Sequence, residues 1–593
     1  MVNLTINDQK VSIEQGTTVL AAAKKLNINI PTLCNHPDLC VAGNCRVCVV
    51  EQSGARTLVA SCATPVSEGM VIHTNSLKVR NARKHIVELL LSEHRSDCTK
   101  CYKNQNCELQ SLANEFAFGD HIFLDLVAGR NYTVDRSSPS FIKDDSKCIH
   151  CQRCVRTCAE LQYISAIGVA NKGAHQKISS FHDRPMSNVV CTNCGQCVNR
   201  CPTGALTEKT YIDMVWDAIY NPEKHVVVQT APAVRVALGE DLGYDPGERV
   251  TGKLVTALRQ LGFDSVLDTD FTADLTIMEE GTELLTRLKK VLVDGDKTTA
   301  IPMFTSCSPG WIKFVEHKYP EFLPNLSTCK SPQQMFGALA KTYYAQRRKL
   351  DPSKIVSVSI MPCTAKKFEA DRPEMRASGY KDVDYVLTTR ELAVMIKQAG
   401  IDFRALEPSK YDSIMGESTG AAVIFGATGG VMEAALRTAY EIVTGKEVPF
   451  KNLNITPARG MDGVKEATIK IEGCTSDWKF LEGAELKVAI AHGLVNANKI
   501  MKLVREGKSP YHFVEIMACP GGCIGGGGQP IPTSMEIRKN RMKAIYSEDE
   551  HMVLRKSHEN PDVIAIYKEF LGKPNSHKSH ELLHTHYIAR ESY

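Results

Sequence analysis

The chain has 593 residues, which implies several domains because single hydrophobic cores seldom exceed about 250–300 residues. Hydrophobic residues make up 43% of it, so it can bury cores, yet no run of about 18 apolar residues and no leader-like start is found. We therefore expect a cytoplasmic protein without a membrane span. Lys and Arg number 71 against 67 Asp and Glu, which does not suggest nucleic-acid binding.

The 22 cysteines are the dominant feature of the composition. Many of them stand in C-x2-C groups, and no secretory leader accompanies them. In such a context the groups favour metal ligation over disulfides.

The first elements in chain order are two short alternating strands at 2–6 and 11–13 and a helix at 18–26. Cys34, Cys45, Cys48 and Cys62 follow, separated by 10, 2 and 13 residues. A long loop before a C-x2-C pair can wrap a small iron–sulfur cluster, and Gly43 allows the backbone to come close to it. A zinc site is the alternative, and Cys40 falls outside the spacing. The pattern resembles the [2Fe–2S] domain of the electron-input subunit of respiratory NADH dehydrogenases and of many [FeFe] hydrogenases.

An apolar helical stretch at 86–91 precedes His94, Cys98, Cys101 and Cys107. The arrangement is similar to the one-histidine, three-cysteine [4Fe–4S] site of the same two families. A neutral imidazole leaves the cluster less anionic and should raise its potential.

Two copies of C-x2-C-x2-C-x3-C come next, as in bacterial two-cluster ferredoxins, in which the fourth cysteine of each copy ligates the other cluster. We assign two [4Fe–4S] clusters to these cysteines. The ligands of the first cluster are Cys148, Cys151, Cys154 and Cys201. The ligands of the second cluster are Cys191, Cys194, Cys197 and Cys158.

Beyond residue 210 apolar strands alternate with amphipathic helices, which indicates an α/β domain. Buried strands are expected at 226–229, 300–304, 355–361 and 513–517, and three of them run directly into cysteines. Ligands at the carboxyl ends of neighbouring strands converge in the crevice of an open α/β sheet. This predicts one polymetallic site fed by Cys307, Cys363, Cys519 and Cys523.

The segments TSCSPGW at 305–311, MPCTAKKFE at 361–369 and MACPGGC at 517–523, followed by four glycines at 525–528, resemble the three signatures of [FeFe] hydrogenases. The resemblance implies an H-cluster, a [4Fe–4S] cubane joined to a di-iron unit with carbonyl, cyanide and dithiolate ligands. It assigns Cys363, Cys519 and Cys523 to the cubane, with Cys523 as the bridge, and Lys366 to a cyanide. It also implies a pocket lined by Ala231, Pro232, Ser331, Pro332, Gln333, Met361 and Met517. Ordinary core is the alternative for the methionines, and a flexible surface loop is the alternative for the glycines.

The first signature departs from the family pattern, because Ser308 stands where the family has a cubane cysteine. Serine is a weaker acid and a harder donor than cysteine. Three outcomes are open: an oxygen-ligated cubane, ligation by Cys307, or a damaged centre. We favour the first.

A buried redox site needs a proton supply. Glu280, Glu283 and Arg287 share one helical face and, with Ser327 and Cys307, match the family's proton path. A solvated charged face is the alternative reading. His580, His584 and His586 have spacing that could bind a metal or serve a structural role, and Cys329 and Cys474 stand alone.

The expected architecture is multidomain, α+β and α/β. It comprises a plant-type ferredoxin β-grasp domain at 1–78, a His/Cys3 cluster domain at 79–138, a bacterial two-cluster ferredoxin domain at 139–209, an α/β H-cluster domain at 210–530 and a small-subunit-like segment at 531–593.

The predicted function is interconversion of H2 with protons and electrons, relayed by one [2Fe–2S] and three accessory [4Fe–4S] clusters. The resemblance implies ferredoxin or flavin- and NAD(P)-binding hydrogenase subunits as partners, and maturation proteins for the di-iron cofactor. The alternative is a catalytically impaired redox sensor or electron-transfer scaffold, favoured if Ser308 abolishes the centre. The cluster-bearing subunit of an NADH dehydrogenase fits residues 1–209 but not the three downstream signatures.

Overall fold

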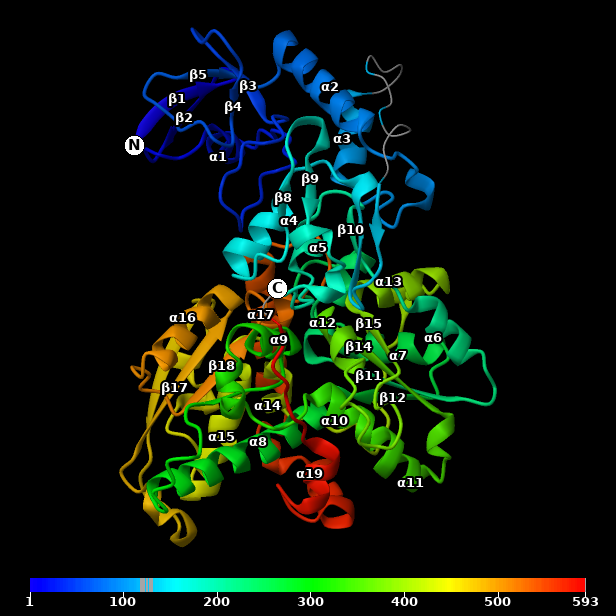
Figure 1. The fold of residues 1–593 in the computed structure, drawn as a ribbon, viewed down its shortest axis with the longest axis vertical. Helices are drawn as coiled ribbons and strands as arrows, with labels where there is room; N and C mark the ends of the chain where they lie inside the picture. The colour runs from blue at the N-terminus through cyan, green and yellow to red at the C-terminus, as the bar shows by residue number, and fades with distance from the viewer. Residues whose placement is uncertain (118–122, 124–125, 127–131, 592–593) are drawn as a thin grey trace. The chain divides into compact units, whose positions relative to one another are not determined.

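A computed structural model describes residues 1–117, 123, 126 and 132–591 (Figure 1). The expected 79–138 domain therefore includes positions that lie outside the described residues. The described chain forms two compact units. Unit 1 comprises 1–160, 165–189 and 200–207, and unit 2 comprises 161–164, 190–199 and 208–593. None of the described helices combines the length and the apolar character needed to cross a bilayer.

Unit 1 begins with a five-stranded sheet in the order β2-β1-β5-β3-β4. The predicted hairpin is present as β1 (Val2–Ile6) and β2 (Gln9–Ile13), and the predicted helix is α1 (Val19–Lys25), capped by the Thr18 hydroxyl. The remaining strands are β3 (Val49–Gln52), β4 (Val59–Ala60) and β5 (Val71–His73). Val2, Leu4 and Ile6 alternate with exposed residues and place one face of the sheet in the core.

The middle of unit 1 is helical. The helix expected at 86–91 is the end of a longer one, α2 (Leu77–Ser92), which begins earlier because the Ser76 hydroxyl caps it. It packs against α3 (Glu108–Phe116). Short elements complete the unit: β6 (Val134–Asp135), β7 (Phe141–Asp144), α4 (Arg153–Arg156), β8 (Gly168–Ala170), β9 (Lys177–Ser179) and β10 (Leu206–Glu208).

Unit 2 contains a parallel four-stranded sheet in the order β12-β11-β14-β15. Its strands are β11 (His225–Thr230), β12 (Ser265–Asp268), β14 (Ile355–Met361) and β15 (Tyr385–Thr388). Val226 and Val228 pack toward α6 (Ile212–Ile219), α7 (Thr251–Gln260) and α13 (Thr389–Gln398), whereas Val227 faces the opposite core. Figure 1 shows α6 and α7 beside β11 and β12. Because both faces are covered, nearly every residue of these strands is buried, including polar ones such as Gln229 and Ser359.

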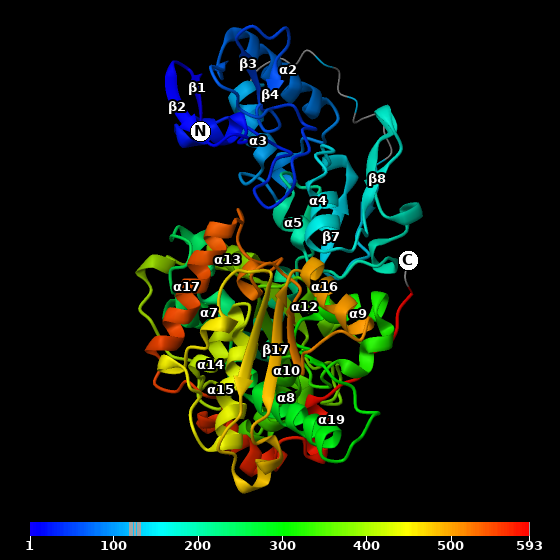
Figure 2. The same cartoon turned by 90° about the vertical axis from the view of Figure 1, so that its left-hand side faces the viewer.

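A second four-stranded sheet of unit 2 has the order β13-β18-β17-β16. Its strands are β13 (Met303–Phe304), β16 (Val464–Lys470), β17 (Glu485–His492) and β18 (Phe513–Met517). Figure 2 shows α15 (Gly430–Thr444) on one side of β17 and α16 (Leu494–Arg505) on the other. The strand expected at 300–304 is shorter than predicted because Pro302 has no N–H to donate to a ladder.

Helices surround the two sheets and complete unit 2. The longest, α8 (Thr269–Leu292), shares buried cores with residues of both sheets. The others are α9 (Pro309–Lys318), α10 (Pro332–Leu339), α11 (Ala345–Arg348), α12 (Ala365–Ala370), α14 (Gly420–Val423), α17 (Met535–His551), α18 (Pro561–Ile566) and α19 (His577–Leu583). A further short helix, α5 (Gln196–Arg200), belongs to the second ferredoxin-type cysteine run, whose residues 190–199 pack with unit 2.

Candidate active site

One cavity of unit 2, with an empty volume of about 800 Å³, collects residues from both sheets. Cys363 follows β14, whereas Cys519 follows β18 and Cys307 follows β13. The strand ends therefore converge, but they belong to two sheets and not to the one open sheet that the sequence suggested. Cys194, Ser308, Lys366 and Cys523 complete the chemically reactive part of the lining.

The three expected cubane cysteines, Cys363, Cys519 and Cys523, are enclosed by protein. Burial raises the pKa of all three thiols, for Cys523 to about 12. Deprotonation at neutral pH therefore requires a strongly attractive positive charge at this position. A metal centre supplies such a charge, since it displaces thiol protons when it binds.

Ser308 and Cys307 line the same cavity next to the start of α9. The Ser308 hydroxyl accepts a hydrogen bond from the Ala518 N–H at 3.2 Å, so it lies beside the residue that precedes Cys519. Burial raises the pKa of the Cys307 thiol well above its usual value, and the nearby Glu280 carboxyl adds to the effect. The Ser308 hydroxyl therefore lies beside the residue that precedes Cys519, while the Cys307 thiol lies close enough to Glu280 for the carboxylate charge to raise the thiol pKa.

Lys366 is held in place by a carboxylate to which sequence reasoning gave no role. Its ammonium donates to the Glu369 carboxylate at 2.9 Å and to the Cys307 carbonyl at 3.1 Å. Ser331 and Gln333 also donate to Glu369, at 2.8 and 3.1 Å. The i, i+3 spacing of Lys366 and Glu369 on α12 was the signal that could have identified this buried pair.

The apolar wall comes from segments far apart in the sequence. Of the residues that the resemblance places there, Ala231, Pro232, Pro332, Gln333, Met361 and Met517 line the cavity. Both methionines are also core residues, so the two readings of them are compatible. Ser331 is not among the lining residues and instead supports Glu369. Thr269, Ala273 and Phe425 also line the cavity and carry no motif.

The glycines at 525–528 are buried backbone and not a flexible surface loop. A Cβ on Gly526 would lie 2.0 Å from the Pro362 carbonyl oxygen, and one on Gly527 would lie 2.2 Å from the Cys194 carbonyl oxygen. Only glycine permits this approach, which brings the third signature against the second and against the Cys194 loop.

The expected proton path starts on α8 and is not a solvated helix face. Ser327 donates to Glu283 at 2.8 Å, and Arg287 donates to the other oxygen of Glu283 at 2.6 Å. Glu280 is only 2% exposed, and its carboxylate oxygens make no well-formed hydrogen bond within the described chain, although Ser327 and the Ser306 backbone lie near enough to oppose the rise of its pKa. Burial, and then the neighbouring charge of Glu283, raises the pKa of Glu280 to about 8. Glu280 can therefore gain and lose a proton near neutral pH.

In unit 1, the sulfurs of the first cysteine group approach one another closely. Cys48 and Cys62 lie 3.3 Å apart, and hydrogen bonds from Cys45 and Cys62 lower the pKa of Cys34. Cys40 instead donates to Glu160 at 2.7 Å. The four grouped sulfurs, without Cys40, can surround a small cluster.

His94 is buried, and burial lowers the pKa of its imidazole, which favours the neutral form that can ligate a metal. Its Nδ1 has no hydrogen-bond partner among the described residues. A Cβ on Gly204 would lie 2.6 Å from the Cys101 sulfur, so glycine leaves room for the cysteine. Cys98 and Cys101 are partly exposed, whereas burial raises the pKa of Cys107.

The two ferredoxin-type runs share a backbone conformation. His150 and Gln152 have positive φ, and so do Asn193 and Gly195 at the same offsets in the second run. The N–H of His150 points at Cys148 and that of Asn193 points at Cys191, at 3.5 and 3.4 Å. This is the structural counterpart of the sequence repeat.

Within unit 1, a cavity of about 460 Å³ brings together the first of the two predicted [4Fe–4S] ligand sets. Its sulfur-bearing lining residues are Cys148, Cys151, Cys154 and Cys201. Burial raises the pKa of Cys148 and Cys151 to about 12. Of the other set, Cys158 belongs to unit 1, and Cys191, Cys194 and Cys197 belong to unit 2.

Residues 224–527 match the family model of the iron-only hydrogenase large subunit, C-terminal domain. This is more than half of the chain. The chain belongs to the iron-only ([FeFe]) hydrogenase family. It is an enzyme, an iron hydrogenase with accessory iron–sulfur domains.

Four shorter matches cover most of the remaining residues of this hydrogenase. Residues 1–76 match a 2Fe-2S iron-sulfur cluster binding domain, and 83–121 match the NADH-ubiquinone oxidoreductase-G iron-sulfur binding region. Residues 138–207 match the ferredoxin-like domain of NADH-quinone oxidoreductase subunit 3, and 535–590 match the iron hydrogenase small subunit.

Among the relatives of this hydrogenase, the NADP-reducing hydrogenase subunit HndD of Solidesulfovibrio fructosivorans is 51% identical over 100% of the chain and 99% of its own length. Iron hydrogenase 1 of Clostridium pasteurianum is 42% identical over 99% of the chain and 100% of its own length. A solved structure of a variant of apo [FeFe]-hydrogenase HydA1 from Chlamydomonas reinhardtii covers 65% of the chain and 100% of its own, with 45% identity and a TM-score of 0.58. The alternative of an impaired sensor or scaffold finds no support in these three.

Proposed function

We propose that this hydrogenase interconverts H2 with protons and electrons at an H-cluster held in the 800 Å³ cavity. The supporting observation is that one cavity is lined by Cys363, Cys519 and Cys523 together with Lys366. Buried thiols with raised pKa values and an inward-facing cation fit an anionic metal cluster. When bound, the cluster supplies redox-active iron and a site for heterolytic cleavage of H2.

In this proposal Cys363, Cys519 and Cys523 hold the cubane, with Cys523 as the bridging ligand. Lys366, oriented by Glu369, provides a charge-assisted hydrogen bond to an anionic ligand of the di-iron unit. Ala231, Pro232, Pro332, Gln333, Met361 and Met517 exclude water from the cavity, and Ser331 acts through Glu369.

The proton path runs from Cys307 through Glu280, Ser327 and Glu283 to Arg287. The raised pKa of Glu280 suits a group that must exchange protons near neutral pH. The Ser327 hydroxyl can pass a proton because it already donates to Glu283 at 2.8 Å. Arg287 orients the second oxygen of Glu283 near the protein surface.

Ser308 serves as the fourth cubane ligand through its hydroxyl oxygen. The hydrogen bond from the Ala518 N–H supports this role, because Ala518 is adjacent to the ligand Cys519. A hard oxygen ligand should lower the cubane potential relative to four thiolates.

The accessory clusters comprise one [2Fe–2S] and three [4Fe–4S]. Four separate ligand sets support this count because no residue is shared between them. The sets are Cys34, Cys45, Cys48 and Cys62; His94, Cys98, Cys101 and Cys107; Cys148, Cys151, Cys154 and Cys201; and Cys191, Cys194, Cys197 and Cys158. We assign the domains to 1–78, 79–138, 139–209, 210–530 and 531–593.

The electron partners are flavin- and NAD(P)-binding subunits, or ferredoxin. The full-length similarity to a subunit named as NADP-reducing and the matches to NADH oxidoreductase regions support a multisubunit assembly. Maturation proteins insert the di-iron unit.

The decisive experiment is hydrogen uptake with a soluble dye as acceptor, measured on protein matured with and without the di-iron unit. Uptake only after maturation is expected. Matured protein with full iron content and no uptake would contradict the proposal.

A further inference from the structure

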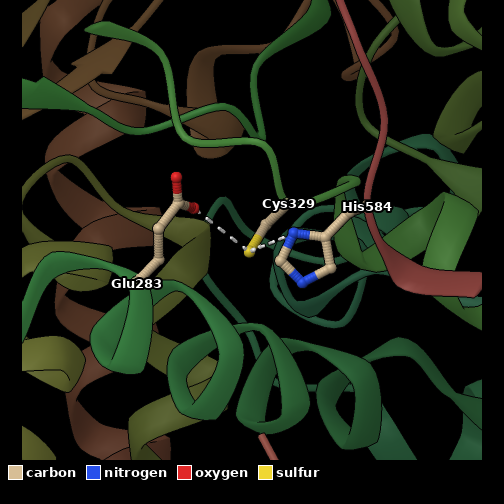
Figure 3. A group of neighbouring side chains, drawn as sticks. All are labelled: Glu283, Cys329 and His584. Atoms are coloured by element: carbon tan, nitrogen blue, oxygen red, sulfur yellow. Dashed lines mark hydrogen bonds between the residues drawn. The ribbon is translucent and has the colours of Figure 1, made fainter. Parts of the chain in front are cut away.

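A second potential metal-binding group lies beside the expected proton path. Figure 3 shows Glu283, Cys329 and His584 pointing toward one another. The Cys329 sulfur lies 3.8 Å from a Glu283 oxygen and 4.0 Å from Nδ1 of His584, and one ligand atom from each residue lies within 4.8 Å of the others. Cys329 was not part of any predicted site, whereas His584 was one of three histidines whose spacing could bind a metal.

These separations are close to those of a tetrahedral zinc site. Zinc–sulfur bonds of about 2.3 Å and zinc–nitrogen or zinc–oxygen bonds of about 2.0–2.1 Å imply ligand-to-ligand distances of roughly 3.5 Å. The sulfur contacts here are only a few tenths of an ångström longer. A ligand atom of Glu283 and one of His584 lie within 4.8 Å of each other, so the three side chains must move closer together when an ion binds.

The backbone holds two of the three ligands opposite each other. Cys329 and His584 form an isolated antiparallel bridge, flanked by hydrogen bonds from Thr585 N to Thr328 O and from Lys330 N to Leu583 O, both at 2.7 Å. The pairing joins the loop before α10 to the residue that follows α19. The juxtaposition is therefore built into the fold and does not depend on flexible side chains.

A second carboxylate orients the imidazole for ligation. Nε2 of His584 lies 3.2 Å from Glu279, so a proton on Nε2 leaves Nδ1 as the metal-binding atom. Such carboxylate–histidine pairs support metal sites generally. The Thr328 hydroxyl now lies 2.8 Å from Nδ1 and must rotate when an ion binds.

The group is buried but can be reached. Cys329 also lines a second, small cavity, together with Thr585 and Tyr587. The exposed His580 ring packs on His584 with centroids 4.1 Å apart. A hydrated ion could be captured by His580 and passed inward, with His580 or water as fourth ligand.

We propose that Glu283, Cys329 and His584 form a site for a zinc-type divalent cation, and that an ion bound there stops turnover by withdrawing Glu283 from proton transfer. Binding releases the Cys329 thiol proton to solvent and leaves a thiolate–metal bond. The blocking effect rests on the proton path proposed above, whereas the binding itself does not.

Another acidic and histidine group, Glu441, His558 and Glu559, does not support a similar site. The Lys556 ammonium already lies 2.9 Å from both Glu441 and Glu559. A cation there would have to displace the lysine from both carboxylates, whereas Arg287 contacts only the Glu283 oxygen that the Cys329 sulfur does not contact.

Zinc content tests the site independently of activity. The iron-loaded enzyme, freed of loosely bound metal under anaerobic conditions, is given one equivalent of zinc, desalted, and examined by metal analysis and zinc X-ray absorption. One retained zinc with a single sulfur neighbour near 2.3 Å is expected. Cys329→Ala should lower retention at least tenfold, whereas Cys40→Ala, which removes an exposed thiol, should not.

Two results would overturn the site: equal zinc retention in Cys329→Ala, or no sulfur neighbour in the parent spectrum. Cys329→Ser keeps the side-chain volume with a weaker zinc ligand, and should reproduce the loss if the alanine variant proves unstable. Iron content is measured in each variant to confirm that the clusters remain.

Zinc inhibition of H2 oxidation tests the blocking effect, with each rate compared with the same variant's zinc-free rate. The parent should lose most of its rate and Cys329→Ala should be at least tenfold less sensitive. If bound zinc leaves the parent rate intact while Glu283→Gln is inactive, the blocking role is wrong. If Glu283→Gln is also active, the proposed proton path is wrong. The metal site is then tested by the zinc content alone.

Discussion

The iron–sulfur region of unit 1 and the cavity of unit 2 collect their ligands in different ways. In unit 1, Cys148, Cys151 and Cys154 follow one another at intervals of three residues, the last of them in α4, and Cys201 completes their cavity. In unit 2, Cys363 and Cys519 come from the ends of strands in two different sheets. Local spacing therefore determines the first kind of site, while the whole fold determines the second.

The electrostatic environments differ as well. The cavity of unit 2 contains Lys366 and lies near Glu280, whose proton can be exchanged near neutral pH. The lining of the Cys148 cavity includes Lys143 and Asp145, which pair with each other. We expect changes in the catalytic cavity to affect rate strongly and changes in unit 1 to affect one cluster at a time.

The largest effect is expected for Glu283→Gln. An amide has a similar shape but cannot carry protons, so turnover should fall by about 10²- to 10⁴-fold. H2 production and uptake rates measure the change, and retained infrared bands of the cofactor show that the cavity is intact. Glu321→Gln, at an exposed ion pair with Arg505, is the matched control. Near-normal rates in Glu283→Gln would remove this residue from the path.

Ser308→Ala should weaken cubane retention, because it removes the proposed oxygen ligand. Iron analysis on protein made without di-iron maturation measures the loss. Cys307→Ala should keep its iron and lose turnover, since Cys307 is proposed to deliver protons. Unchanged iron in Ser308→Ala combined with lost iron in Cys307→Ala would make Cys307 the ligand.

Ser308→Cys sharpens the same comparison. A fourth thiolate is a softer ligand than a hydroxyl oxygen and matches iron–sulfur bonding better. The variant should retain activity and show a higher cubane potential in a redox titration. A lower or unchanged potential would argue against oxygen ligation in the parent.

Cys45→Ser should affect unit 1 alone. We expect the [2Fe–2S] signal in electron paramagnetic resonance to be lost or altered, with the [4Fe–4S] signals retained. Dye-linked H2 oxidation should fall far less than in Glu283→Gln, because small dyes can bypass the first cluster. Cys40→Ser, at a thiol that bonds to Glu160 and not to the sulfur group, should leave the signal unchanged. Equal losses in both variants would show that the spacing argument misplaces the ligands.

Much of the fold was predictable because its signals are local. Alternating residues predicted β1 with its bounds and β2 two residues too short at its start. Mainly apolar stretches predicted the buried strands β14 and β18 with the bounds that the structure shows. The division of the strands between two sheets was not predictable, since an apolar run does not indicate which partner a strand takes. The length of β13 was also overestimated, although Pro302 marked its limit.

The site was predictable in part for the same reason. Signature spacing selected the cysteines and Lys366, which do line one cavity. Glu369 was passed over because a buried acidic partner on α12 has no motif of its own. The pairing of Cys329 with His584 could not be anticipated, because a bridge between chain segments so far apart depends on the complete fold.

The smallest effect concerns the pH dependence that Glu280 imposes on the rate. Its pKa of about 8 means that the buried carboxyl keeps its proton below pH 8 and loses it above. H2 production needs that proton, so the rate should fall above pH 8, by up to about tenfold per pH unit where this step limits. A pH–rate profile at saturating reduced dye measures this fall in rate above pH 8. The control variant Glu321→Gln should show the same fall at the same pH. A flat profile from pH 7 to 9.5 would show that Glu280 does not limit proton supply.

The raised pKa of Glu280 can also be tested through the stability of the protein, without measuring catalysis. Between the ordinary carboxyl value of 4.5 and about 8, the folded protein keeps a proton that the unfolded chain has lost. The stability contributed by the neutral Glu280 is therefore fully present below pH 4.5 and is lost as pH rises through that window. Glu280→Gln stays neutral throughout, so its apparent melting temperature should fall less between pH 5 and 8 than that of the parent. If the melting temperatures of the parent and of Glu280→Gln change equally between pH 5 and 8, Glu280 has an ordinary carboxyl pKa. The proton path would then need another group with a raised pKa between Cys307 and Glu283.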